Sequence, residues 1–368
     1  MRKKEVAIIS LGAFAALCWT LIVILCAFFT GYRAFKWAVK STERVVFVTS
    51  SNLESEPGVR ILDANNPYFK VLRMEPNRVD VKWAKSSIEM KKASCRLKKF
   101  DSPLVHIMAR LNEKEYPVVI DSGCPVDLVV NDMIIKDNKL EIFPFESTNS
   151  ALAGFCHVEK IQIGDLTITN PTCSYTLNHY EKRVLGRTKW KRRQILFGLG
   201  LMHKFRYFLI DNVTPEVEFS LHDSFKAEPV EMWRHYHMSV EKTEKNTKKL
   251  MIHITIAGEE IKANLDTGTE WCLAMSQSAW NKLSTKFHVL KESKDRARFF
   301  NGWKDIKKIT VKQLSIGDKS LTDASIVVFN DSLFGENFII IGMDYFKDTV
   351  VVIDFQRNLV WVLKSQSS

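Results

Sequence analysis

The strongest constraint on the fold is an internal duplication, in which three landmarks recur in the same order. The first is an apolar strand that ends in Asp, a small hydroxyl residue and Gly, at Asp121 and again at Asp266. The second is the tripeptide Ile-Gly-Asp, which begins at Ile163 and at Ile316. The third is an apolar run to Gly, a short amphipathic piece and an apolar run to Asp. Such an ordered recurrence predicts two halves that fold alike.

The spacing of the landmarks supports the duplication. The interval from the first landmark to the Gly of the third is 77 residues in the first copy, at Gly198, and 76 in the second, at Gly342. The Asp residues that close the third landmark, Asp211 and Asp354, lie 90 and 88 residues after the first. We expect these two to cap or turn strands. The halves are therefore predicted to span 105–224 and 250–368.

Short strands dominate the pattern between and around the landmarks. Residues 41–104 alternate apolar runs with turn residues, and we expect this extension to belong to the first half. Only a few segments indicate a helix, among them Ser276–Leu283. The charged stretch 225–249 is predicted to connect the halves. The pattern is typical of an all-β chain.

The N-terminus carries a different signal. Residues 6–30 contain no charged side chain and are long enough to cross a membrane as a helix. The run is longer than that of a cleaved signal peptide and no A-x-A cleavage site follows it, so residues 1–40 are predicted to hold an uncleaved single-pass anchor. Basic residues flank both ends, and the positive-inside rule does not decide the orientation. Because an anchor at the start usually exports the chain that comes after it, we expect the lobes on the non-cytoplasmic side, periplasmic or extracellular/lumenal.

Composition excludes several classes of protein. With 46% hydrophobic and 26% charged residues, the chain is neither disordered nor a coiled coil. The net charge of +11 is scattered and no nucleic-acid-binding motif accompanies it, so no nucleic-acid partner is expected. The seven cysteines include no C-x-x-C pair, and no H-E-x-x-H motif occurs. We therefore expect no metal and no cofactor, and one disulfide stays open as an alternative.

The repeated carboxylates suggest the chemistry. If the halves pack about a pseudo-twofold axis, the turns after Asp121 and Asp266 meet. Two carboxylates a few ångströms apart cannot both ionise cheaply, so the pair would hold one proton. The ionised member can take a proton from an attacking water while the protonated member donates to a carbonyl oxygen. The proton belongs to the pair rather than to either residue.

These residues resemble the aspartic proteases of the pepsin/retropepsin clan, and the halves look closest to the retropepsin-like branch. The resemblance is carried by the turns Asp121-Ser122-Gly123 and Asp266-Thr267-Gly268, and by the segments that end in Gly198 and Gly342. It covers about 105–366. It implies a bilobal acid-protease fold of two pseudo-twofold-related lobes, one catalytic Asp in each lobe, and an extended peptide bound in the interlobe cleft.

The resemblance also implies roles for the neighbours of the two Asp residues. The hydroxyls of Ser122 and Thr267 would bond to the opposite turn, and Gly198 and Gly342 would support the turns from behind. Thr269 matches a position whose hydroxyl bonds its neighbouring Asp. In the first half that position is Cys124, a weaker donor, and Pro125 follows it.

The family closes a β-hairpin flap over its substrate, between the first and second landmarks. In the first half the candidate is 150–160, with Gly154 near the tip. In the second half it is 298–307, where Asn301 and Gly302 give a hairpin turn signal. No tyrosine occupies either candidate. A hairpin in each half favours the two-flapped, retropepsin-like arrangement.

The sequence thus predicts a membrane-anchored aspartic endopeptidase that acts as a monomer on membrane-proximal proteins, with Asp121 and Asp266 as its catalytic residues. Two alternatives remain. One is an inactive, membrane-tethered peptide-binding or sensor module of the same fold, which Cys124 and Pro125 favour. The other is an unrelated hydrolase with two carboxylates, such as a glycosidase, whose carboxyl groups would be roughly 5–9.5 Å apart.

Overall fold

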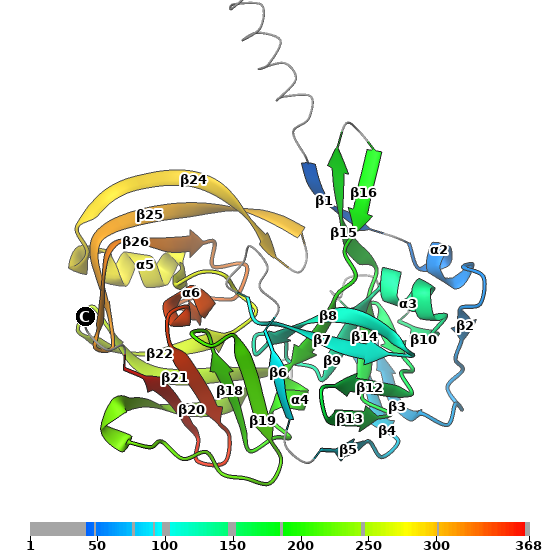
Figure 1. The fold of residues 1–368 in the computed structure, drawn as a ribbon. Helices are drawn as coiled ribbons and strands as arrows, with labels where there is room; N and C mark the ends of the chain where they lie inside the picture. The colour runs from blue at the N-terminus through cyan, green and yellow to red at the C-terminus, as the bar shows by residue number, and fades with distance from the viewer. Residues whose placement is uncertain are drawn as a thin grey trace, which may run out of the picture. The chain divides into compact units, whose positions relative to one another are not determined.

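Strands form most of the part of the chain that the computed structural model describes (Figure 1). The described residues are 42–47, 49–75, 78–90, 93–97, 104–145, 152–184, 187–243, 247–299 and 302–364. The predicted anchor at 6–30 lies outside them. Within these ranges, no helix combines the length and the apolar character that a membrane crossing requires.

The chain divides into two compact units. The smaller unit comprises 1–46 and 180–192, so it takes a segment out of the predicted first half. Its described strands belong to a three-stranded sheet, with β15 (Asn178–Val184) between β1 (Thr42–Phe47) and β16 (Arg187–Lys191). The larger unit comprises 47–179 and 193–368, and it contains both Asp turns.

One sheet of the larger unit is built mainly from the first half. Its spatial order is β2-β10-β11-β14-β9-β17-β8-β7-β12-β13-β5. The strands are β2 (Arg60–Ile61), β5 (Ser87–Glu89), β7 (His106–Leu111), β8 (Lys114–Asp121), β9 (Leu128–Asn131), β10 (Glu141–Pro144), β11 (Gly154–Cys156), β12 (Lys160–Ile163), β13 (Leu166–Thr169), β14 (Cys173–Thr176) and β17 (Ile195–Gly198). β2 and β5, which come from the N-terminal extension, lie at the two ends of this sheet. The extension also holds α2 (Ser50–Glu54) and the hairpin of β3 (Phe69–Glu75) and β4 (Arg78–Trp83).

A second sheet continues from the second half into a shared layer. Its order is β24-β25-β26-β23-β27-β22-β21-β20-β29-β28-β18-β19-β6. The strands are β6 (Ala93–Arg96), β18 (Tyr207–Asp211), β19 (Glu216–Ser220), β20 (Trp233–Lys242), β21 (Lys248–Ile256), β22 (Glu259–Asp266), β23 (Leu273–Ser276), β24 (Val289–Phe299), β25 (Gly302–Ile316), β26 (Lys319–Phe329), β27 (Ile339–Gly342), β28 (Val350–Asp354) and β29 (Leu359–Leu363).

The same succession of pairings occurs in both halves. The order β10-β11-β14-β9-β17-β8-β7 in one corresponds to β24-β25-β26-β23-β27-β22-β21 in the other. A helix follows the strand after each Asp turn: α3 (Asp132–Asn138) follows β9, and α5 (Gln277–Leu283) follows β23. Each begins at a side-chain cap, because Asn131 accepts from Ile134 N and Ser276 from Ala279 N. The helix predicted at Ser276–Leu283 is thereby confirmed.

The Ile-Gly-Asp landmarks occupy equivalent turns. The first joins β12 to β13 and the second joins β25 to β26. Gly164 and Gly317 both have a φ of 54°, the left-handed region that glycine adopts without strain. The residue type at these two positions is therefore set by the backbone of a tight turn.

The strand that ends in Gly passes directly behind each Asp turn. β17 pairs parallel with β8, which places Gly198 beside Asp121. β27 pairs parallel with β22, which places Gly342 beside Asp266. Each of these strands also pairs antiparallel with the strand that follows the turn. The strands that enter and leave each Asp turn are thus both paired with the same buried strand.

Short helices follow each of these glycines, α4 (Leu199–Met202) and α6 (Met343–Phe346), and the chain then enters the shared layer. There β18 pairs with β28 along five residues, so the third landmark of one half joins that of the other. As expected, the closing carboxylates cap turns: Asp211 accepts from Val213 N and Thr214 N, and Asp354 accepts from Arg357 N.

The predicted connector, 225–249, is more structured than its charge suggested. After the 3-10 turn η1 (Val230–Met232), the ten-residue strand β20 pairs with β29 and β21. Its apolar side chains supply the reason: Met238 is buried in the main core, and Trp233 packs in a second cluster. Tyr236 and Val240, two residues to either side of Met238, pack against the same core, and the polar residues between these three concealed the alternation. A second 3-10 turn, η2 (Ser284–Lys286), follows α5.

We predict that Gly342→Ala destabilises the fold, although Gly342 has an ordinary negative φ. A Cβ there would collide with the backbone oxygen of Trp271 and with Thr269, whose carbonyl oxygen accepts from Met343 N. The expected loss in the free energy of unfolding is about 1–3 kcal/mol, the usual cost of overpacking. Urea denaturation measures it. Val213→Ala, at a residue that is 63% exposed, is the control and should change stability by less than about 0.5 kcal/mol. Equal stabilities would contradict the close packing behind the turn.

Candidate active site

The turns that carry Asp121 and Asp266 lie against each other. A Cβ at Gly123 would stand 2.5 Å from Cγ of Asp266, and one at Gly268 would collide with the carboxyl group of Asp121. Each carboxylate therefore occupies the space over the glycine of the opposite turn. Only glycine leaves that space open, which explains the residue type at both positions.

Four hydrogen bonds hold the two turns together. Ser122 N donates to Thr267 Oγ1 at 2.9 Å, and Thr267 N donates to Ser122 Oγ at 3.0 Å. Each hydroxyl then donates to a carbonyl of the opposite strand. Ser122 Oγ reaches Leu265 O at 2.7 Å, and Thr267 Oγ1 reaches Ile120 O at 2.8 Å. Ser122 and Thr267 are 0% and 1% exposed, so none of these groups has water as a ready alternative.

The sequence pattern indicated the two hydroxyls but not their carbonyl acceptors. Ile120 and Leu265 immediately precede the two Asp residues, and they contribute only backbone oxygens to the site. Any apolar residue could supply such an oxygen. The available signal was the position itself, one residue before each Asp, rather than the side chain.

The carboxylates are partly buried: Ser122 and Thr267 beside them are closed off from solvent, whereas Gly123 is exposed. Cys124 N donates to Asp121 Oδ1 at 3.0 Å, and Gly268 N donates to Asp266 Oδ1 at 2.9 Å. These donors favour the ionised forms. Burial opposes them and raises the pKa of both groups, and for Asp121 the charge of Asp266 raises the pKa further. The pair therefore holds on to a proton above the ordinary range of an Asp side chain.

Thr269 and Cys124 follow the two turns at equivalent positions, and neither side chain plays the role that the resemblance implied. Thr269 was predicted to bond Asp266 through its hydroxyl. In the described part of the chain Thr269 Oγ1 forms no hydrogen bond, because its methyl group faces Gly342 and Gly268 N serves the carboxylate instead. At the equivalent position of the first turn, burial keeps the pKa of the Cys124 thiol well above its ordinary value, so this thiol is neutral. Both carboxylates are thus supported by backbone N–H groups.

The two predicted flap positions have different outcomes. Gly154 is not at a hairpin tip: it is buried at the start of β11, opposite Pro144 of β10 and Tyr175 of β14. A Cβ there would collide with the carbonyl oxygen of Phe143, so close strand packing explains this glycine. The connection between β10 and β11 instead spans 145–153.

In the second half, β24 and β25 form a long antiparallel hairpin in which Phe299 lies opposite Gly302. Gly302 therefore adjoins the two-residue connection at 300–301, which lies outside the described residues. Phe299 packs on Trp271, five residues after Asp266, with ring centroids 5.6 Å apart. The register of the β24–β25 hairpin brings the two rings together near the turn that follows Asp266.

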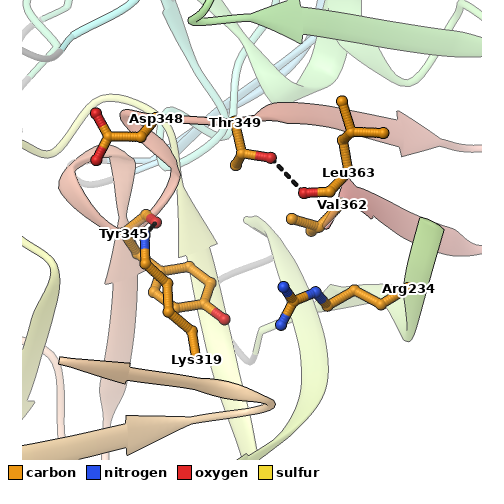
Figure 2. A pocket seen from close by; sticks show the side chains of 7 residues that line it. All are labelled: Arg234, Lys319, Tyr345, Asp348, Thr349, Val362 and Leu363. Carbon is orange, nitrogen blue, oxygen red and sulfur yellow. Dashed lines mark hydrogen bonds between the residues drawn. The ribbon is translucent and has the colours of Figure 1, made fainter. Parts of the chain in front are cut away.

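A pocket in the structure is lined by residues other than Asp121 and Asp266. A pocket of about 220 Å³ is lined by Arg234, Lys319, Tyr345, Asp348, Thr349, Val362 and Leu363 (Figure 2). Neither catalytic candidate is among these residues. Among the residues that the structure describes, no group of three or more His, Cys, Asp or Glu side chains is arranged to hold a metal ion.

Comparison with known solved structures gives low-identity matches. One is conglutin gamma, a basic 7S globulin from lupine seeds, at 11% identity and a TM-score of 0.42. Another is the basic 7S globulin from soybean, at 12% identity and a TM-score of 0.39. In both cases the match covers 75% of this chain and 96% of the other. No curated protein matches the chain.

A protein-family model gives a more local match. The family described as gag-polyprotein putative aspartyl protease matches residues 252–348. This range contains the turn at Asp266 and its supporting Gly342, and it lies within the second half. The second half is therefore similar to this aspartyl protease family, and the mostly β architecture agrees with an all-β, aspartic-protease-like fold.

Proposed function

We propose that this chain is an aspartic endopeptidase whose catalytic pair is Asp121 and Asp266. The observation that carries the proposal is the reciprocal bonding of Ser122 and Thr267, which brings one carboxylate from each half over the glycine of the other turn. Such closeness fits two groups that share a proton. It does not fit the separation of roughly 5–9.5 Å that glycosidases require.

The pair supplies a base and an acid at once. The ionised carboxylate takes a proton from a water molecule as its oxygen attacks the peptide carbonyl carbon, and the protonated one donates to the carbonyl oxygen. The resulting tetrahedral species then breaks its C–N bond as a carboxyl group delivers a proton to the leaving nitrogen. The two Asp side chains perform each of these proton transfers, and the Ser122–Thr267 bonds keep the two carboxyls aligned.

The substrate is proposed to be an extended peptide in a cleft between the halves, bound by strand-like main-chain pairing. A single chain carries both turns, which supports a monomeric enzyme. Residues 6–30 are proposed to anchor it as a single membrane-spanning helix, with the lobes on the non-cytoplasmic side. This placement would favour membrane-proximal protein substrates.

The direct test is cleavage of a diverse peptide library by the full chain in detergent, read by mass spectrometry from pH 3 to 8. Asp121→Asn and Asp266→Asn should each lower the cleavage rate by roughly 10²–10⁴-fold, because either change removes one member of the acid–base pair. Matched thermal melting of the variants checks that they fold. Cuts that persist in either variant would overturn the assignment of the pair. No cuts from a folded wild type at any pH would favour the inactive peptide-binding module.

The raised pKa values predict an unusual pH dependence of stability. A carboxyl whose pKa is higher in the folded state binds more protons folded than unfolded, so its contribution is favourable below the unfolded value and is lost as pH rises through the folded one. The wild type should therefore lose stability relative to Asp121→Asn as pH rises above about 4. Melting temperatures of both proteins across pH measure this. A constant difference between the two would contradict a shared, retained proton.

The hydroxyl of Thr267 should be needed more than its methyl group. Thr267→Val leaves Ser122 N and Ile120 O without partners in a buried site, which should cost about 1–3 kcal/mol of unfolding free energy. We also expect a fall in kcat, because the carboxylates lose their alignment. Thr267→Ser keeps the hydroxyl and is the matched control, so it should retain most of the activity. Similar losses in the Ser and Val variants would argue against the bonding role.

A further inference from the structure

Two cysteines of the first half lie side by side in neighbouring strands. Cys156 ends β11 and Cys173 begins β14, and their Sγ atoms are 3.4 Å apart. Both residues are 0% exposed. In the antiparallel register of these strands Phe155 lies opposite Ser174, so the next pair along is Cys156 opposite Cys173. Within the described ranges this is a direct contact between two thiols from different strands.

The geometry of this pair suits a covalent bond. Residues directly opposite each other in antiparallel strands have Cα atoms about 4.5–5.5 Å apart. A disulfide requires about 4.4–6.8 Å between Cα atoms and about 2.05 Å between sulfurs. The two Sγ atoms must therefore approach by a little more than 1 Å, which rotation about the side-chain bonds can supply. No strand has to move.

We propose that Cys156 and Cys173 form a disulfide when the chain folds in contact with a disulfide-bearing oxidoreductase. One cysteine thiolate attacks the disulfide of the oxidant and forms a mixed disulfide. The other thiolate then attacks the protein sulfur of that bond and releases the oxidant as a dithiol. The two cysteines are oxidised by two electrons, and their two protons end on the thiols of the oxidant.

The burial of the two cysteines determines when during folding the disulfide can form. Burial raises the pKa of the Cys156 thiol well above its ordinary value, and the Cys173 thiol beside it raises it further. A reactive thiolate is therefore scarce once the sheet has closed. The bond would form while β11 and β14 are still pairing. Once formed, it would be shielded from reductants in solution.

The bond would fasten one part of the first half. β11 lies between β10 and β14, and it is the returning strand of the β10–β11 hairpin. A disulfide to β14 closes the loop 157–172 and limits the freedom of the unfolded chain. This effect on stability is independent of any peptidase activity, so it can be tested even on an inactive protein.

Peptide mapping of the full chain tests the proposal directly. The protein is produced in parallel through an oxidising secretory route and in a reducing cytosol, unfolded in the presence of an alkylating reagent, and digested with trypsin without reduction. Cleavage after Lys160 separates the two cysteines, into peptides 140–160 and 161–182. We expect these peptides to be linked in the secreted protein and separately alkylated in the cytosolic protein. Two alkylated peptides from the secreted protein, or a link from either cysteine to another one, would overturn the proposal.

Thermal melting provides a second readout. Reduction under conditions that open the bond should lower the melting temperature of the secreted wild type by roughly 5 °C or more. The double variant Cys156→Ala, Cys173→Ala should melt at the same temperature with and without reductant. Cys95→Ala is the matched control and should keep the full response. A wild type whose melting is insensitive to reduction would count against the bond.

Discussion

The structure depends on the exchange of hydrogen bonds between Ser122 and Thr267. Each hydroxyl accepts from the backbone of the other turn and donates to the strand beyond it, so four buried bonds are satisfied together or lost together. The packing of each half fixes its own turn through β17 or β27. The hydroxyl exchange then fixes one turn against the other, and the opposed glycines let the carboxylates come close.

Much of this arrangement could be predicted from residue types whose position has one physical explanation. Glycine at 164 and 317 occupies a left-handed turn, and Ser276 caps a helix that begins where expected. The predictions failed where one residue type serves two purposes. Gly154 was predicted to lie near a hairpin tip, but it permits strands to pack closely. The hydroxyl of Thr269 was expected to serve Asp266, yet backbone N–H groups support both carboxylates.

The connector shows another limit. The charged stretch 225–249 was predicted only to connect the halves, but its strand β20 places Met238 in the core and exposes His235, His237 and Lys242. In such a strand, the alternation of Tyr236, Met238 and Val240 matters more than the average polarity of the segment. The contact of Phe299 with Trp271 was hidden for a different reason. It depends on the register of a hairpin whose strands are eleven and fifteen residues long, which no local pattern specifies.

Carrying two turns on one chain has a consequence for the proposed binding of a peptide. When identical subunits form such a site, every change in sequence appears on both sides of the symmetry axis. Here unlike residues, Cys124 and Thr269, follow the two turns, and the Trp271–Phe299 pair is contributed by the second half. A peptide has a direction, from its amino to its carboxyl end. If the proposed peptidase function holds, the unlike residues on the two sides of the site would let it distinguish the two orientations of the same peptide backbone.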